Sequence, residues 1–205
     1  MFSLFSLYIF LFYMLRCYGQ ILQLGECRVL DTVEYFDLQR FLGEWYEIKR
    51  YPTWYEDGGQ CASKTFSMCG RRIGIEQKFV KNEIEYIINM NSTYAPGDDA
   101  IFQVNATNVD PIGMPLSVLA TDYTNYAILF GCKANEQLKI RYISAWILSR
   151  KPNLDPDLLD QTLRILRRLP MSNNVYFEDV SHEEEKCRHD WSAYIHIEAN
   201  DTLLA

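Results

Sequence analysis

Eight short, strand-like segments between residues 43 and 150 constrain the fold of this chain more than any other feature. They span residues 44–51, 62–68, 73–80, 83–93, 100–105, 116–122, 126–132 and 138–149, and none of them has a helical period. Gly, Asn, Asp or Pro residues separate them in the stretches YEDGGQ, CGRR, KNE and YAPGDD, as turns require. Successive hairpins predict an all-β, antiparallel meander, and eight strands is the number that closes into a β-barrel with room for one small ligand.

Alternation along these segments predicts which side chains point into the barrel, because successive residues of a strand face opposite ways. Apolar residues share one face at Ala62, Phe66 and Met68, at Ile84, Tyr86, Ile88 and Met90, and at Phe102 and Val104. Asn91 and Asn105 fall on the opposite, outer face, and each begins an Asn-x-Ser/Thr glycosylation signal. A third signal begins at Asn200, so we expect a glycoprotein with one or two of these sites used.

Composition and charge limit the classes of partner. A chain of 205 residues with 48% hydrophobic content is long and apolar enough to bury the core of one domain. Its formal net charge of −7 would repel a phosphate backbone over most of the surface. We therefore exclude nucleic acid as a partner.

The chain begins with the apolar run MFSLFSLYIFLFYML, which is followed by Arg16 and the small-residue ending CYG. This pattern predicts a secretory signal peptide over residues 1–19, and the run is shorter than the roughly 20 residues that a membrane-spanning helix needs. No basic residue precedes the run, so an uncleaved anchor is the alternative. We expect one domain over residues 20–190, with its barrel at about 43–150, and a C-terminal tail over residues 191–205.

Secretion changes the expected state of the cysteines, because an oxidising compartment lets them form disulfides. Cys17 would leave with the signal peptide, and the remaining five are Cys27, Cys61, Cys69, Cys132 and Cys187. At least one of these five is unpaired or bonded to another chain. Spacing alone leaves fifteen arrangements of two disulfides open.

A helix is expected after the last strand, over about residues 156–169. Asp155 is a suitable N-cap, Pro156 suits the first turn, and Pro170 ends the segment. Leu159, Leu163 and Leu166 make an apolar stripe, which predicts that the helix packs on the outside of the barrel.

Three blocks of sequence resemble the signature blocks of the lipocalin family, in their proper order. They are FDLQRFLGEWYEIKRYP, LATDYTNYAILFGC and AWILSRKPNL, and with the eight strands and the helix the resemblance covers nearly the whole mature chain. It is strongest to the branch of apolipoprotein D, the Lazarillo proteins and the insect bilin-binding proteins.

The resemblance implies roles for residues at the closed end of the barrel and for four cysteines. Trp45 would pack at the closed end with Arg150 across its ring, a cation–π contact worth about 1 to 2 kcal/mol, and Gly43 would leave space at that corner. The branch also implies disulfides joining Cys27 to Cys132 and Cys61 to Cys187. Cys69 would then remain as an exposed thiol or, alternatively, link two chains into a dimer.

The resemblance further implies a secreted carrier of a small hydrophobic ligand, such as a fatty acid, sterol, retinoid or tetrapyrrole, with a role in lipid homeostasis and oxidative-stress protection. No enzymatic activity, catalytic residue, cofactor or metal is expected. Expected ligand-lining residues are Trp146, which matches the tryptophan that lines the pocket in this branch, and Phe66, Tyr86, Phe41 and Leu148. Inward aromatic residues also fill small barrels without binding anything, and that alternative stays open.

Two further expectations concern surfaces. Trp54 and Tyr55 lie in the long loop YPTWYEDGG, where they gate the mouth, dip into a membrane or lipoprotein surface or, alternatively, pack on the rim. The tail from His182 holds all three histidines among carboxylates, and we interpret it as a solvated segment and not as a metal site. Alternative functions are a signalling or stress-protective protein that acts through its surface, or a lipocalin enzyme that depends on Cys69.

Overall fold

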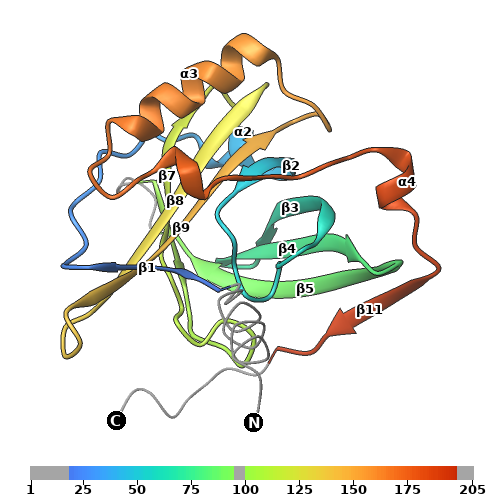
Figure 1. The fold of residues 1–205 in the computed structure, drawn as a ribbon, viewed down its shortest axis with the longest axis horizontal. Coiled ribbons are helices and arrows are strands. Elements are labelled where there is room, and N and C mark those ends of the chain that lie inside the picture. The colour runs from blue at the N-terminus through green and yellow to red at the C-terminus, as the bar shows by residue number, and fades with distance from the viewer. Residues whose placement is uncertain (1–18, 95–99, 198–205) are drawn as a thin grey trace, which may run out of the picture.

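In the computed structural model, residues 19–94 and 100–197 are described, and they form a closed antiparallel barrel with helices outside it (Figure 1). Residues 1–18 of the predicted signal peptide, the loop residues 95–99 and the segment 198–205 with Asn200 lie outside the described residues. The strands are β1 (Ile21–Leu24), β2 (Gly43–Arg50), β3 (Gln60–Cys69), β4 (Arg72–Lys81), β5 (Ile84–Thr93), β6 (Ile101–Val104), β7 (Leu116–Thr121), β8 (Tyr126–Asn135), β9 (Ile140–Ser149), β10 (Glu178–Asp179) and β11 (Trp191–Ile195). The helices are α2 (Leu38–Phe41), α3 (Pro156–Arg167), the 3₁₀ turn η1 (Asn174–Tyr176) and α4 (Glu184–Cys187).

Strands β2 to β9 are the eight predicted strands, and they pair in sequence order as a meander. Pairing of β9 with β2 closes the barrel. The weakest joins lie on either side of β6, which shares two residue pairs with β5 and two with β7. The predicted fold class is confirmed, with strand bounds shifted by up to three residues.

Short terminal strands, which the sequence did not predict, cover the edges that the barrel strands leave free. On β9, residues 146–149 pair with β2, whereas residues 140–143 pair with β1. On β5, Ser92 and Thr93 pair with β6, whereas residues 84–88 pair in parallel with β11. Both additions satisfy backbone groups that would otherwise form exposed edges. Residues 191–195, expected as part of a solvated tail, form a strand whose side chains are mostly exposed.

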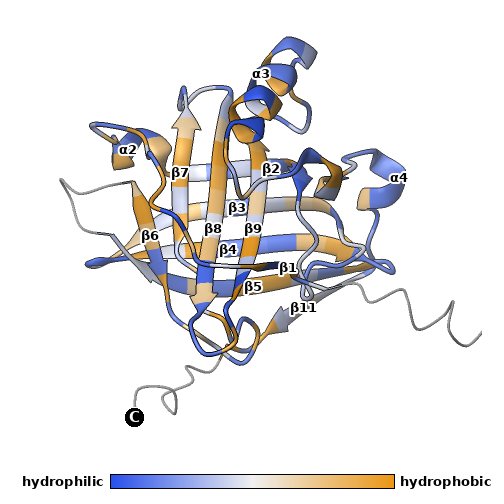
Figure 2. Cartoon of the chain, turned by 60° about the vertical axis from the view of Figure 1, so that its left-hand side comes forward, coloured by the Kyte–Doolittle hydropathy of each residue, from blue (hydrophilic) through white to orange (hydrophobic). Residues whose placement is uncertain are grey.

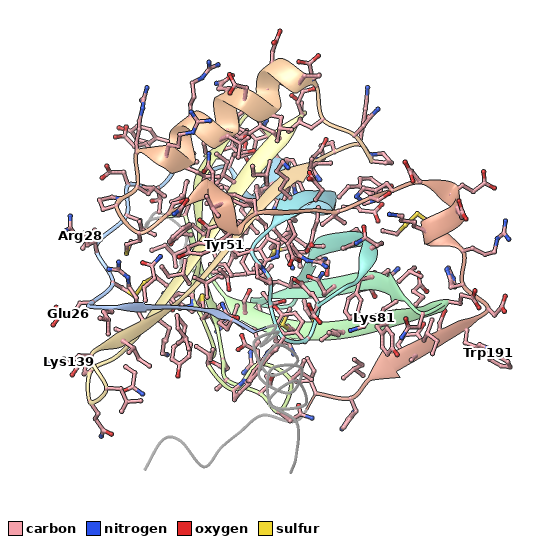
Figure 3. The ribbon with its side chains drawn as sticks, in the orientation of Figure 1. Glu26, Arg28, Tyr51, Lys81, Lys139 and Trp191 are labelled. Atoms are coloured by element: carbon pink, nitrogen blue, oxygen red, sulfur yellow. A yellow bond between two sulfur atoms is a disulfide. The ribbon has the colours of Figure 1, made fainter. Side chains whose placement is uncertain are left out.

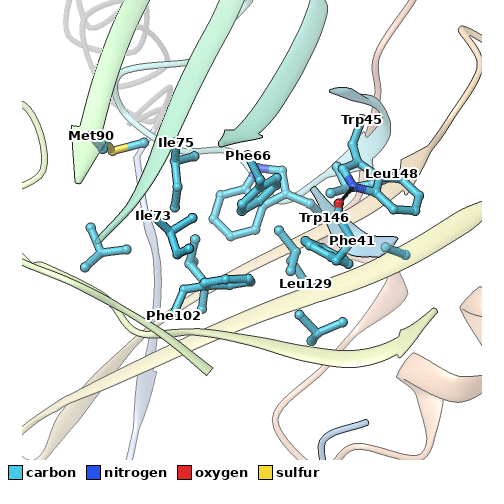
Figure 4. Packing of buried hydrophobic residues seen from close by; sticks show 14 of the residues in the cluster. Phe41, Trp45, Phe66, Ile73, Ile75, Met90, Phe102, Leu129, Trp146 and Leu148 are labelled. Carbon is cyan, nitrogen blue, oxygen red and sulfur yellow. Dashed lines mark hydrogen bonds between the residues drawn. The ribbon is translucent and has the colours of Figure 1, made fainter. Parts of the chain in front are cut away.

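Two apolar clusters divide the fold into an inside and an outside. The inner cluster contains the inward residues of the barrel strands (Figure 4). The outer cluster lies between α3 and the wall, where Leu166 of the helix packs with Ile128 and Phe130 of β8 and Ile147 of β9. Hydropathy follows this division, because α3 is apolar on one side only while β8 and β9 are apolar along much of their length (Figure 2). Asp155 caps α3, as predicted, by accepting hydrogen bonds from the N–H groups of Asp157 and Leu158.

The closed end is built around Trp45, whose ring N–H donates to the carbonyl of Phe41 at 2.8 Å (Figure 4). The guanidinium carbon of Arg150 lies 3.7 Å from the centroid of the Trp45 ring. Gly43 has a φ of +99°, and a Cβ placed there would come within 3.2 Å of an Arg150 nitrogen. Glycine meets both demands, since it has no Cβ and adopts positive φ at little cost.

Two disulfides attach the chain ends to the barrel, and they join the pairs that the resemblance implies. Cys27 is bonded to Cys132 of β8, and Cys61 of β3 is bonded to Cys187 of α4. Such bonds typically contribute about 2 to 4 kcal/mol each. In the part of the chain that the structure describes, no helix combines the length and apolarity required to cross a membrane.

Candidate functional site

A cavity opens inside the barrel at the end away from Trp45. It is lined by Gln20, Tyr55, Lys64, Ile75, Met90, Val104, Asp110, Met114, Leu116, Ser144 and Trp146. The space open to the centre of a water molecule is about 20 Å³. One buried water needs about 10 to 15 Å³ by this measure, so the cavity as it stands admits water and not a lipid.

The floor of the cavity carries a buried ionic network centred on Lys64. The ammonium lies 2.9 Å from Glu47 Oε1 and 3.0 Å from Glu56 Oε1, and it also donates to Gln77 Oε1. These four side chains are no more than 1% exposed. Because desolvating an ion costs several kcal/mol, such an arrangement persists only with charges paired and hydrogen bonds satisfied.

Arg50 connects this network to the loop between β2 and β3. Its Nη1 donates to Glu47 Oε2 at 3.2 Å, and its Nη2 donates to the carbonyls of Glu56 and Gly59 at 2.7 and 2.6 Å. Thr53 donates to Glu56 Oε2 at 2.9 Å. The loop is thereby drawn into the barrel, and two cations face two carboxylates.

Trp146 joins the network to the apolar part of the cavity. Its ring lies 4.6 Å from the Lys64 ammonium, and its N–H points to Glu56 Oε2 at 3.4 Å. A cation against an aromatic face gains most where water is excluded, as it is at this 3% exposed residue. Trp146 therefore lines the cavity with a ring whose π electrons interact with the Lys64 charge.

The charge balance shows in the ionisation of Glu47. Burial raises the pKa of the Glu47 carboxyl. The charges of Lys64 and Arg50, with hydrogen bonds from Gln77 and Lys64, together lower it by more than burial raises it, so the net pKa lies below the ordinary value. Its folded-state pKa is thus below its unfolded-state pKa. The stability that Glu47 contributes is complete above the unfolded value, about 4.3, and is lost as the pH falls through the folded value.

We expect Glu47→Gln to flatten the acid side of the stability profile. In the native sequence, the free energy of unfolding should fall steeply with pH below about 4.3, because protonating Glu47 breaks two buried ion pairs. Urea unfolding measured between neutral pH and the acid transition gives the slope. Glu136→Gln, in the exposed β8–β9 turn, controls for the loss of one negative charge. An acid slope unchanged by Glu47→Gln would contradict this reading.

The five residues predicted to line the pocket separate into two groups. Trp146 lines the cavity. Phe66 and Phe41 pack against each other at a centroid distance of 5.1 Å, and with Leu148 they lie in the inner cluster, away from the cavity. Tyr86 is half-buried and stacks on Phe79 at 5.3 Å. These four are not among the residues that line this cavity, and their contact with a ligand stays a prediction.

The loop aromatics Trp54 and Tyr55 point in different directions, one toward solvent and one into the barrel. Trp54 is 44% exposed, whereas Tyr55 turns inward and lines the cavity. Burial, followed by the nearby carboxylates of Glu56, Asp110 and Glu47, raises the pKa of the Tyr55 hydroxyl well above its ordinary value. Tyr55 thus packs inward, and contact of this loop with a membrane or lipoprotein surface stays a prediction.

The remaining predicted residues lie on the outer surface. Asn91 and Asn105 are exposed, as alternation predicted. Cys69 is a free, exposed thiol at the end of β3 and does not line the cavity. Met68, placed inward by alternation, is 49% exposed, since it lies at the end of the β3–β4 hairpin.

The sequence reading missed the network, although part of its signal was visible. Lys64 lies between inward Ala62 and Phe66 at the same strand parity, and Gln77 likewise lies between Ile75 and Phe79. Polar residues at inward positions predict a buried polar network. Arg50 could not be found this way, because a register shift between Glu47 and Lys49 changes the parity of the strand.

Comparisons with known proteins agree with this barrel. Residues 42–183 match the model of the lipocalin / cytosolic fatty-acid binding protein family. Insecticyanin-B of Manduca sexta is 28% identical over 179 residues, covering 83% of this chain and 86% of that protein. Apolipoprotein D of Bos taurus is 30% identical over 173 residues, covering 80% and 84%. The resemblance seen in the sequence is thus confirmed.

Solved structures give the same answer. Insecticyanin of the tobacco hornworm Manduca sexta superposes with a TM-score of 0.74 at 25% identity, over 86% of this chain and 96% of that one. Lobster apocrustacyanin A1 superposes with a TM-score of 0.68 at 18% identity, over 80% and 92%, which shows the shared fold. A closed barrel with an internal cavity is the structure of a small-molecule binding protein. The chain belongs to the lipocalin family.

Proposed function

We propose that this chain is a secreted, glycosylated lipocalin that carries a small hydrophobic molecule in its barrel and catalyses no reaction. Fatty acids, sterols, retinoids and tetrapyrroles are the ligand classes of suitable size and apolarity. The observation that carries the proposal is the cavity, whose apolar side is formed by Ile75, Met90, Val104, Met114, Leu116 and Trp146. Burying an apolar ligand there gains about 25 cal/mol per Å² removed from water.

Any such ligand needs a larger cavity than the one present, and two features support the wall beside β6 as the place where the barrel widens. Met90 and Met114 are unbranched, so they can change rotamer at low cost. Val104 of β6 and Leu116 of β7 line the wall where β6 shares only two residue pairs with each neighbouring strand. We infer that the ligand enters by displacing the methionines and separating the wall beside β6.

A pair of neighbouring substitutions on β6 tests carriage. Val104→Phe should weaken binding of the best ligand from a retinol, cholesterol, palmitate and biliverdin panel by about tenfold or more, because the added ring occupies the cavity and overpacks it. Gln103→Phe places the same ring on the exposed face of the same strand and should leave affinity unchanged. Fluorescence titration measures both. Equal affinities for the two variants would place the ligand outside this cavity.

A surface function is the second candidate, and β11 favours it. Trp191 and Tyr194 are each 74% exposed, and Trp191 points away from the barrel (Figure 3). Tyr and Trp residues are enriched in protein–protein interfaces relative to the rest of the surface. Partner binding that persists in Val104→Phe and is lost in Trp191→Ser would favour this function over carriage. An enzyme that depends on Cys69 has less support, since that thiol lies outside the cavity.

A further inference from the structure

Lys64 is the one cation among the described residues that line the cavity, and its hydrogen-bonding capacity is used. An ammonium has three N–H donors. The acceptors are Glu47 Oε1 at 2.9 Å, Glu56 Oε1 at 3.0 Å and Gln77 Oε1. A carboxylate entering the cavity would find no free charged donor on Lys64 and would face Glu47 and Glu56 behind it.

The acidic groups near the cavity are occupied as well. Glu56 accepts from Lys64 through Oε1 and from Thr53 through Oε2, with the Trp146 N–H close to the same oxygen. Asp110, which lines the cavity, accepts from the N–H of Ile112 at 3.1 Å. Burial raises the pKa of the Asp110 carboxyl, while backbone hydrogen bonds lower it less. An ammonium entering the cavity would therefore meet the positive charge of Lys64, while Asp110 already accepts backbone hydrogen bonds.

Two residues that carry hydroxyl groups also line the cavity. Tyr55 and Ser144 line it, and Ser144 Oγ accepts a hydrogen bond from the Gln20 amide. A hydroxyl both donates and accepts, so these groups suit an uncharged polar end. Burying an ion without a new partner costs several kcal/mol, whereas burying a hydroxyl that finds a hydrogen bond costs far less.

We propose that the barrel selects amphiphiles whose buried polar end is uncharged, such as an alcohol, over carboxylates and amines with the same hydrocarbon chain. This inference rests on the proposed function and narrows it, because it favours neutral sterol-like or retinol-like molecules over fatty acids and dicarboxylic tetrapyrroles. The charges on the cavity floor act as a filter against charged ligands.

Three ligands with one hydrocarbon chain test the filter on the mature, disulfide-bonded protein. Dodecanol, dodecylamine and dodecanoate are titrated separately by isothermal calorimetry near neutral pH. Dodecanol should bind about tenfold or more tightly than either charged ligand. Dodecanoate binding as tightly as dodecanol, or dodecylamine binding as tightly, would overturn the inference and leave carriage intact. Failure of all three to bind the folded protein would contradict carriage itself.

Glu56→Gln tests the cause of the selection, because it leaves the floor with one excess positive charge and releases part of Lys64. Dodecanoate affinity should then rise about tenfold relative to dodecanol. Asp57→Asn is the matched control, since it removes one negative charge from the same loop at a partly exposed position beside Lys81. Equal relative affinities in the two variants would show that the buried charges do not set the preference. If Glu56→Gln does not fold, the comparison in the native sequence still decides the inference.

Discussion

Replacing Lys64 by methionine is expected to lower the free energy of unfolding by about 3 to 5 kcal/mol, because among the described residues it leaves the buried Glu47 and Glu56 with Arg50 as their one cationic partner. Methionine keeps most of the side-chain volume, so the loss reports the uncompensated charge and not a cavity. Urea unfolding with both disulfides intact measures the change.

Two further variants separate this effect from ordinary charge loss. Lys78→Met removes a β4 lysine whose pair with Glu76 is over a third exposed, and it should cost less than about 1 kcal/mol. The double variant Lys64→Met with Glu56→Gln should be more stable than Lys64→Met alone, because it restores charge balance. Similar small losses for Lys64→Met and Lys78→Met would mean that the network is solvated.

Replacing Arg150 by alanine is the second large change, with an expected loss of about 3 kcal/mol. The guanidinium donates to five backbone carbonyls, those of Arg40, Phe41, Leu42, Glu44 and Tyr123, at 2.8 to 3.1 Å. It also covers the Trp45 ring, so its removal opens the closed end of the barrel.

Arg150→Lys is the informative comparison. Lysine keeps the charge but lacks the planar fork that reaches several carbonyls at once, so it should recover less than half of the lost stability. Thermal unfolding of the three proteins gives the order. Full recovery by lysine would show that charge alone holds this end, and a negligible loss in Arg150→Ala would show that α2 closes the barrel unaided.

The strands and α3 could be predicted because their signals are local. Alternation identified inward positions such as Phe66, Phe102 and Val104, and the cap at Asp155 with the stripe through Leu166 identified the helix. The terminal strands β1 and β11 could not, since each is defined by the edge that it covers. The parallel pairing of β11 with β5 depends on a contact more than a hundred residues away in sequence.

The site was only partly predictable for a related reason. Trp146 follows from the resemblance and from its parity, and Lys64 and Gln77 had the parity of buried residues. Glu56 lies in a loop, where no periodicity reports direction, and its burial results from hydrogen bonds with Thr53 and Arg50 that exist only in the folded chain. From the family resemblance alone we expect an apolar barrel interior, whereas the structure has buried ion pairs beside the cavity.

Carriage of a small molecule in the barrel is the central claim, and native mass spectrometry of the protein secreted from eukaryotic cells tests it most directly. We expect the mature chain to carry one copy of a hydrophobic molecule, identifiable after solvent extraction, and to lose it in Val104→Phe but not in Gln103→Phe. Empty protein that also fails to bind retinol, cholesterol, palmitate or biliverdin would contradict carriage and favour a function of the surface around Trp191.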